Sequence, residues 1–400
     1  MTLQTGVAVD VAYEAEASFG LKPDAGGGRI IRRTASSINL RKESYQPNEV
    51  RSDFQIQDFR HGARRVEGSI EGELSLSTYD DFVEAALRGT WAAGVGFIAG
   101  SGTGVTVSDA GKTFTRAGGS WLTDGFKIGD VVRFANLDAG IDGRNLRVVG
   151  LTATVMTVAE APGADVAVDD EACSCAVVGR KLTTGVVARS FAIEHVYNDV
   201  DFSQVFTGCR IGEMRLSLPP SGVAKVTFGV TGKDMELLED AAAPWFTAPA
   251  PATTTGVLAA VDGVLRVAGV DVGVVTGLDL TIALGLKAEA VVGANTTPDV
   301  FYGRTNVTGN LTAFLTGGTL LKHFLDEDEV SLHVVLNEPG GTGGFVAIHL
   351  PRLKFTSGDI TGQGEQGLPI QLPFQALLKA DGGAGTAWDK TTIGVQVSNA

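Results

Sequence analysis

The sequence predicts a mainly β protein. We expect two tandem β-sandwich or barrel domains, each with one short flanking helix, and a small β domain inserted into the first. Three observations lead to this fold class: two sequence signals occur twice, their spacing differs by about one small domain, and most segments alternate apolar and polar residues as half-buried strands do. The 53 glycines agree, because glycine supplies the positive φ angles of tight turns.

The duplication is visible in two pairs of segments. IEGEL at 70–74 is matched by VTGNL at 307–311, and IGEMRL at 211–216 is matched by IHLPRL at 348–353. The signals start 141 positions apart in the first copy (211 − 70) and 41 apart in the second (348 − 307), so the first copy carries 100 additional residues. We therefore divide the chain into a first domain at 1–95 plus 183–243, an insert at 96–182, a linker at 244–256 and a second domain at 257–400.

The first copy begins with a segment that has little periodicity. Residues 1–28 end in three glycines, and we expect an arm that a neighbour must order. Strand-like alternation runs over 29–41. Residues 44–62 are polar, contain Pro47 and carry mixed charge, so we expect a long loop that is functional or awaits a partner. Residues 64–76 return to strict alternation and predict a strand.

A change of period after this strand predicts a short helix over 77–88. Asp80 and Asp81 lie in its first turn, near the positive end of the helix dipole, and Gly89 ends it. The second copy repeats the pattern at 316–325, with apolar residues at helical spacing. Each copy is therefore expected to carry one amphipathic helix.

The remaining segments differ in composition. Glycines at 96–104 are expected to act as a flexible hinge, and short strands separated by Asp-Gly turns follow, which suggests a small barrel or sandwich. Residues 244–256 are rich in Pro, Ala and Thr and predict a semi-stiff linker. Prolines confine the strand at 369–374 to an edge or a bulge. The glycine-rich tail, 379–400, is expected to pack on a neighbour.

Composition and charge argue against several classes of function. The net charge of −14 is spread along the chain without a basic stripe, which argues against tight nucleic-acid binding. Three cysteines are too few for a disulfide framework. The start of the sequence lacks the pattern of a secretion signal, and charges interrupt the most apolar stretch, 256–286. We expect a protein that is cytosolic when made and has no membrane segment.

Candidate catalytic and metal-binding groups are sparse. The five histidines fall in no metal-binding spacing. The acidic run 326–329, near His323 and His333, lacks the regular oxygen spacing of a calcium loop. Cys173 and Cys175 have no further ligands of the kind that zinc requires. We therefore expect no enzymatic activity, no cofactor and no bound metal.

Five motifs between residues 29 and 91 form a specific pattern. They are RRTASSINL (32–40), NEVRSD (48–53), DFRHG (58–62), RVEGSIEGELS (65–75) and YDDF (79–82). This pattern resembles the tail tube proteins of long-tailed bacteriophages. The duplicated strand-and-helix layout is consistent with the resemblance over most of the remaining chain, apart from the insert.

The resemblance implies a structural virion protein. In that family, the inner sheets of neighbouring subunits join into a continuous barrel, and stacked rings form the hollow tube through which the genome leaves for the host. The duplication here favours a trimeric ring with pseudo-six-fold symmetry, with the insert outside. A diffusely acidic channel would repel DNA. Implied partners are further copies of the chain, the tape-measure, terminator and distal tail proteins, and double-stranded DNA that passes without specific binding. The implied location is the virion tail, after assembly in the host cytoplasm.

The segment 29–65 also supplies the candidates for the assembly interface. Its densest positive patch, at 60–65, lies beside several acids, which favours charge pairing within one sheet or between subunits over phosphate binding. The candidates are Arg32, Arg33, Asn48, Glu49, Arg51, Asp53, Asp58, Arg60, His61, Arg64 and Arg65. The alternative function is a virion-surface module that binds carbohydrate or cells, for which Trp91, Trp121 and Trp245 are the aromatic candidates.

Overall fold

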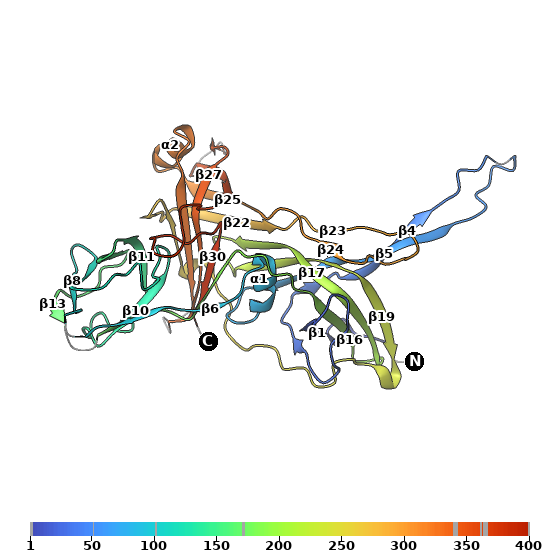
Figure 1. Cartoon of the computed structure of the whole chain (residues 1–400). Helices are drawn as coiled ribbons and strands as arrows, with labels where there is room; N and C mark the ends of the chain where they lie inside the picture. The colour runs from blue at the N-terminus through green and yellow to red at the C-terminus, as the bar shows by residue number, and fades with distance from the viewer. Residues whose placement is uncertain are drawn as a thin grey trace.

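The structure is a computed structural model, and it describes residues 3–50, 52–100, 102–169, 173–338, 343–360, 362 and 367–398. Within these residues it contains thirty strands and two α-helices, so the mainly β fold class is confirmed. Twenty strands belong to one connected sheet system, and eight belong to a separate sheet that lies at one side of the molecule (Figure 1). No helix in the described part of the chain is long and apolar enough to cross a membrane.

The elements of the first copy lie on both sides of the insert. They are β1 (Val9–Ala15), β2 (Arg29–Ile30), β3 (Ala35–Ser36), β4 (Asn39–Tyr45), β5 (Arg60–Glu73), α1 (Asp80–Leu87), β6 (Ala92–Ala93), β15 (Arg180–Thr183), β16 (Phe191–Tyr197), β17 (Phe202–Leu218), β18 (Lys225–Gly232), β19 (Asp234–Glu239) and the 3-10 helix η1 (Asp240–Ala242). The insert supplies β7 (Gly96–Ile98), β8 (Val105–Ser108), β9 (Thr113–Arg116), β10 (Val131–Ala135), β11 (Leu146–Leu151), β12 (Val155–Val158), β13 (Val166–Asp169) and β14 (Ser174–Val177).

The second copy follows the linker and runs to the last described residues. Its elements are the 3-10 helix η2 (Ala260–Asp262), β20 (Gly263–Val267), β21 (Val270–Asp271), β22 (Val275–Ala283), β23 (Lys287–Ala288), β24 (Val300–Phe301), β25 (Asn306–Phe314), α2 (Thr319–Leu325), β26 (Val330–Asn337), β27 (Phe345–Phe355), β28 (Asp359–Ile360), β29 (Pro369–Ala376) and β30 (Gly394–Val397).

The two copies share one strand order. In the first copy, β1, β16, β17, β18, β5 and β3 are neighbours in that sequence. In the second copy, β20, β26, β27, β29, β25 and β22 repeat it. The helix α1 follows β5 and α2 follows β25, where the sequence predicts them. The duplication is therefore present in the topology.

The strand β17 joins the two copies. Its first half pairs with β16 and β19, and its second half pairs with β18 on one side and β22 on the other. The β17–β22 pairing runs from Glu213 opposite Ala283 to Leu218 opposite Leu278. Eight strands consequently lie side by side: β3, β5, β18, β17, β22, β25, β29 and β27.

One apolar core runs through both copies. Phe82 of α1 lies at its centre in the first copy and is fully buried. Its ring centroid is 4.7 Å from that of Tyr13 on β1, 5.2 Å from Phe191 on β16 and 5.4 Å from Phe228 on β18. The helix therefore packs its apolar face against both layers of the first copy, as the amphipathic pattern of 77–88 predicts.

The insert has a core of its own. Trp121 is fully buried in it, and the rings of Phe114 and Phe134 stack with centroids 4.1 Å apart. These aromatic side chains pack mainly on one another, so the insert buries apolar surface within itself.

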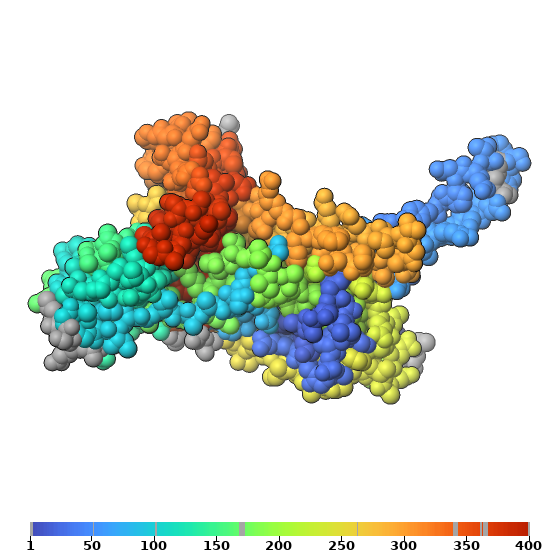
Figure 2. Space-filling model, viewed as in Figure 1, coloured from blue at the N-terminus to red at the C-terminus, as the bar shows by residue number. Residues whose placement is uncertain are grey.

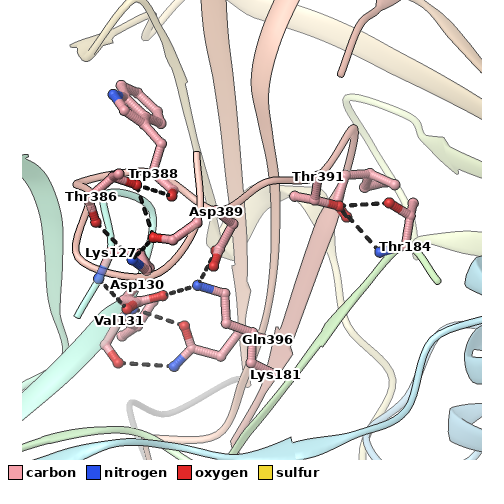
Figure 3. Close-up of polar contacts among 12 residues, drawn as sticks. Lys127, Asp130, Val131, Lys181, Thr184, Thr386, Trp388, Asp389, Thr391 and Gln396 are labelled. Atoms are coloured by element: carbon pink, nitrogen blue, oxygen red, sulfur yellow. Dashed lines mark hydrogen bonds and ion pairs between the residues drawn. The ribbon is translucent and has the colours of Figure 1, made fainter. Parts of the chain in front are cut away.

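The insert is fixed to the second copy rather than attached through a hinge (Figure 3). The ammonium group of Lys181 lies between the carboxylates of Asp130, on the insert, and Asp389, in the C-terminal segment, at 2.5 Å from the latter. The side-chain amide of Gln396 on β30 exchanges two hydrogen bonds of 2.9 Å with the backbone of Val131. These buried contacts correct the expectation of a flexible hinge, because they would have to break before the insert could move.

A further expectation from the sequence is wrong. The described part of the segment before residue 28 is not a loose arm, because β1 pairs along its whole length with β16 and buries Val11 and Tyr13 in the core. The predicted semi-stiff linker, 244–256, packs on the first copy. Phe246 is buried, and the carboxylate of Glu194 accepts backbone hydrogen bonds from residues 245 and 246 at 2.6 and 3.0 Å.

A buried histidine ties the two layers of the first copy together. The Nε2 atom of His195 on β16 lies 2.9 Å from the hydroxyl of Ser36 on β3, and its ring packs edge-on against Phe206 at 5.1 Å. Burial, with a smaller contribution from the charge of Arg33, lowers the pKa of His195 to about 4. The imidazole is therefore neutral in the folded protein at neutral pH.

We predict that this histidine makes the protein less stable in acid. Between its ordinary pKa of 6.5 and its folded pKa of about 4, the unfolded chain binds a proton at His195 and the folded chain does not. Stability is therefore lost as the pH falls through this window, by roughly 3 kcal/mol. Urea unfolding at pH 7 and pH 4.5 should show a smaller acid loss for His195→Gln than for the wild type, and equal losses would contradict the assignment.

We also predict that Lys181→Met destabilises the junction between the insert and the second copy. Removing the ammonium group leaves the carboxylates of Asp130 and Asp389 without their shared cation, which costs about 3–5 kcal/mol for a buried charge. Urea unfolding measures this loss. The double variant Lys181→Met, Asp130→Asn should recover part of it, because one buried charge is then removed. A single variant as stable as the wild type would refute the buried ion pair as an anchor.

Candidate assembly surface

The eight adjacent strands present one polar face. A single cross-strand row contains Glu71, Thr227, Arg215, Thr281, Thr308, Gln375 and Lys354. None of these side chains is buried, whereas residues next to them along the strands, such as Ile70 and Phe228, are in the core. The run of strands therefore has one apolar face in the core and one polar face outside it.

A second row shows that this face is balanced in charge. It contains Glu73, Lys225, Ser217, Asp279, Asn310 and Pro373. Together the two rows carry three acidic and three basic residues among uncharged polar ones. Glu213 shares this face of β17 with Arg215 and Ser217. These residues give the face no excess of cations that would hold a phosphate backbone.

The two ends of the eight-strand run are not alike. In the part of the chain that the structure describes, β3 and β4 pair only with β5, so their outer edge has no strand partner. At the other end, β26 pairs with β27 as far as Leu353 and leaves Lys354 and Phe355 open on that side. In the first copy, the pairing of β16 with β17 ends at Cys209 of β17, which leaves the stretch of β17 from Glu213 onwards free for β22.

The hairpin of β4 and β5 projects from the body of the molecule (Figures 1 and 2). We call residues 46–59, which connect the two strands, the arm tip; Arg51 within it lies outside the described residues. Three apolar side chains of the arm tip are largely open: Val50, Phe54 at 98% and Ile56 at 71% exposed. The segment expected as a loop at 44–62 is thus the end of a long hairpin, and it carries apolar groups that none of the described residues covers.

The equivalent connection in the second copy lies flat on the first copy. Residues 284–305 join β22 to β25 and run towards the base of the β4–β5 hairpin (Figure 1). The amide of Leu284 donates to the carbonyl of Gly212 at 2.8 Å. The guanidinium of Arg210 is 2.8 Å from the carboxylate of Asp299. The connection between β22 and β25 therefore packs on the copy before it.

Six of the interface candidates lie on the arm tip or beside it, and all are exposed: Asn48, Glu49, Asp53, Asp58, Arg60 and His61. Asp58 accepts a hydrogen bond from the amide of Phe59 at 2.7 Å and pairs with Arg60 at 3.4 Å. The backbone hydrogen bond, followed by that from Arg60, lowers the pKa of Asp58. The ring of His61 packs edge-on against Phe59 at 4.9 Å. These contacts are local and leave the arm free to meet another surface.

Arg32 and Arg33 instead bind to their own chain. The guanidinium of Arg32 donates to the carbonyl of Thr255 at 2.6 Å, and that of Arg33 donates to the carbonyl of Val9. The two side chains hold the linker and β1 against the segment between β2 and β3. Their interactions are structural within the subunit.

Arg64 and Arg65 pair with acids of the same sheet. Arg64 is 2.6 Å from the carboxylate of Asp234 on β19. Arg65 is 2.5 Å from Glu67 and 3.2 Å from Glu43, and the hydrogen bond that it donates to Glu67 is the main cause that raises the pKa of Arg65. Charge pairing within one sheet, one of the two interpretations of this basic patch, is what these contacts show.

The candidates for other chemistry are engaged in structure. In the acidic run 326–329, Asp328 is 2.9 Å from the Nδ1 atom of His323, and Glu329 accepts hydrogen bonds of 2.5 and 2.7 Å from Arg352. These acids are neutralised by cationic or polar partners and are not gathered around an open space.

The cysteine pair and the aromatic candidates for sugar binding are largely inside the molecule. Cys173 and Cys175 are buried in the core of the insert, where burial raises the pKa of the Cys175 thiol. Trp121 is fully buried there as well, and Trp91 and Trp245 are half-buried. Trp121 thus cannot serve as an exposed platform for carbohydrate.

The comparison with known families covers nearly the whole chain. A family model described as "Phage tail tube protein" matches residues 6–376, which includes both copies and the insert. The chain belongs to the phage tail tube protein family. It is therefore a structural component of the virion tail, and self-assembly into the tube is the property that the family implies. Comparison with curated proteins finds no matching relative.

Sequence reasoning missed the strongest features of this tail tube protein's assembly surface. The alternation of Glu213, Arg215 and Ser217 with core residues indicates a two-faced strand, but it does not name β22 as the partner. Phe54 and Ile56 were passed over because they lie in a segment that is polar on average. Two apolar residues spaced two apart in such a segment are the signal that could have indicated a contact surface.

We predict that the apolar groups of the arm tip contribute nothing to the stability of the isolated subunit. The variant Phe54→Ser, Ile56→Ser should change the free energy of unfolding by less than about 0.5 kcal/mol, because both side chains are open to solvent. Phe82→Ala, in the core, should lose about 3–5 kcal/mol in the same urea titration. A large loss in the arm variant would mean that the arm folds back onto its own subunit.

Proposed function

We propose that three copies of this tail tube protein form a ring with pseudo-six-fold symmetry, and that stacked rings form the hollow tube. The observation that carries the proposal is the β17–β22 junction, which joins equivalent sheets of two copies within one chain. Each chain supplies eight adjacent strands, so three chains would supply 24 (3 × 8) around a closed barrel. Closure would remove the free edge that β3 and β4 present.

The proposal keeps the division into a first domain at 1–95 plus 183–243, an insert at 96–182, a linker at 244–256 and a second domain at 257–400. The repeated strand order supports two equivalent domains, and the separate core of the insert supports its treatment as a third unit. In a ring, the insert would lie outside the wall, because the wall has room only for the adjacent strands and the layer behind them.

The polar face of the eight strands would line the channel. Uncharged polar side chains and balanced charges along both rows give DNA no cationic surface to bind, which supports passage of the genome without specific contacts. We propose accordingly that the tube conducts the genome to the host. Its further partners would be the tape-measure, terminator and distal tail proteins, and assembly would take place in the host cytoplasm.

The arm would connect subunits. Residues 284–305 pack on the preceding copy within the chain, whereas the β4–β5 hairpin, the equivalent segment of the first copy, projects from the body of the molecule. The arm would therefore pack on another subunit, in the same ring or the next. Burial of Phe54 and Ile56 there would supply part of the free energy of association.

We predict that removal of the arm tip prevents tube formation without unfolding the subunit. In the variant, residues 46–59 are replaced by Asn-Gly, which closes a two-residue hairpin between β4 and β5. Negative-stain electron microscopy over a range of concentrations should show rings or tubes with three-fold or six-fold averages for the wild type, and none or isolated rings for the variant.

Circular dichroism should show that the variant keeps the wild-type β content. Normal tubes from the variant would contradict the role of the arm. Wild-type protein that stays monomeric at every concentration would contradict the ring itself.

A further inference from the structure

The two helices of the tail tube protein occupy equivalent places but differ in burial. In α1, the apolar residues Phe82, Val83 and Leu87 are each at most 7% exposed. In α2, Leu320, Leu321 and Phe324 are only partly buried, and Leu325 is 68% exposed. The helix α1 follows β5 and α2 follows β25, which hold equivalent places in the strand orders of the two copies, so the difference must come from what lies on the other side of each helix.

The second copy covers α1 from that other side. The helix contacts β22, and Val83 lines a small apolar cavity together with Val346 and Ile348 on β27 and Val395 on β30. The helix is therefore held between the sheet of its own copy and the core face of the next copy. Its apolar residues are thus buried by residues of both copies, which meet at the β17–β22 junction.

Nothing in the described chain covers α2 in the same way. The helix stands at the outer end of the second copy (Figures 1 and 2), where it contacts β27 of its own copy. Other exposed apolar residues lie on the segment before α2 and on segments of the same copy that follow β27: Phe314 at 45%, Leu315 at 37%, Ile360 at 49% and Leu368 at 43%. The amide of Leu315 bonds the carbonyl of Leu368 at 2.9 Å, so these segments form one surface. We call Phe314, Leu315, Leu325, Ile360 and Leu368 the α2 patch.

We propose that the α2 patch packs against the first copy of a second molecule, as α1 packs against the second copy within the chain. This inference rests on the proposed ring. The surface that receives it is the strand region at 31–37, including β3, because this region precedes β5 as β22 precedes β25. The open edge of β27 would pair with the free edge of β3, and the α2 patch would pack beside that pairing.

The strand edges that can pair between subunits are shorter than those that pair within one chain. Apolar contacts of the helix therefore matter more between subunits than between the two copies of one subunit. The β17–β22 junction has six registered pairs of residues. The matching edge of β27 offers only Lys354 and Phe355, because β26 occupies the rest. Backbone pairing alone would therefore hold neighbouring subunits less firmly than the two halves of one subunit, and apolar burial by α2 would supply the difference.

The test compares two substitutions that each add one negative charge to α2. Leu325→Asp places the charge within the α2 patch, and Thr319→Asp places it on the polar side of the same helix, where the residue is exposed. Both variants should unfold at the wild-type urea midpoint, because both side chains are largely open to solvent. Sedimentation velocity and electron microscopy should show that Leu325→Asp needs about tenfold more protein, or more, to form rings. Thr319→Asp should assemble as the wild type does.

The possible outcomes distinguish a failure of the α2 inference from a failure of the proposed ring. If Leu325→Asp forms rings at wild-type concentrations, the α2 inference is wrong and the ring proposal stands. If the wild type forms no rings, the proposed function fails and the α2 inference fails with it.

A cross-linking measurement identifies the receiving surface. Leu325→Cys introduces an open thiol, whereas Cys173, Cys175 and Cys209 are buried, so a benzophenone maleimide should label residue 325 selectively. After irradiation of assembled protein, mass spectrometry should locate links within residues 29–45 of another chain. Links confined to the insert or to the second copy would overturn the proposal.

Discussion

The backbone pairing of β17 with β22 is the interaction on which the rest of the structure depends. Without it, each copy would end in an open row of amide and carbonyl groups, and the two apolar faces would not merge into one core. The pairing is possible because β17 is long enough to serve two layers: its first half completes the sandwich of its own copy, and its second half extends beyond β16 to meet the next copy. The burial of α1 and the course of 284–305 follow from this junction.

The insert makes the two copies different in a specific way. On the first copy, residues 284–305 cover the outer face of β17 near Arg210 and Gly212. On the second copy, the matching stretch of β27 contains His349, and it is the insert that lies there, with Gly129 so close to the imidazole that a Cβ atom would approach Nδ1 to 2.3 Å. The equivalent face of the equivalent sheet is thus covered by residues 284–305 in the first copy and by the insert in the second.

Periodic elements could be predicted from the sequence, and contacts between distant elements could not. The alternation at 64–76 and the stripe at 77–88 correspond to β5 and α1, because local pattern decides both. The strand β1 was missed because its seven residues gain stability only by pairing with β16, far along the chain. The anchoring of the insert by Lys181 was missed for the same reason, since its two carboxylate partners lie at positions 130 and 389. Among the interface candidates, composition could not separate Arg32, which binds its own linker, from Arg60 on the free arm.

The linker 244–256 has a kinetic meaning as well as a structural one. Because it tethers β22 to the copy that carries β17, that junction forms as an intramolecular event, at an effective concentration in the millimolar range or above. A ring built from six single-copy subunits requires five encounters between molecules, and a ring of three such chains requires two. Nucleation of the ring would then depend on a lower power of subunit concentration, so assembly could begin earlier in an infection, when few copies of the protein have been made.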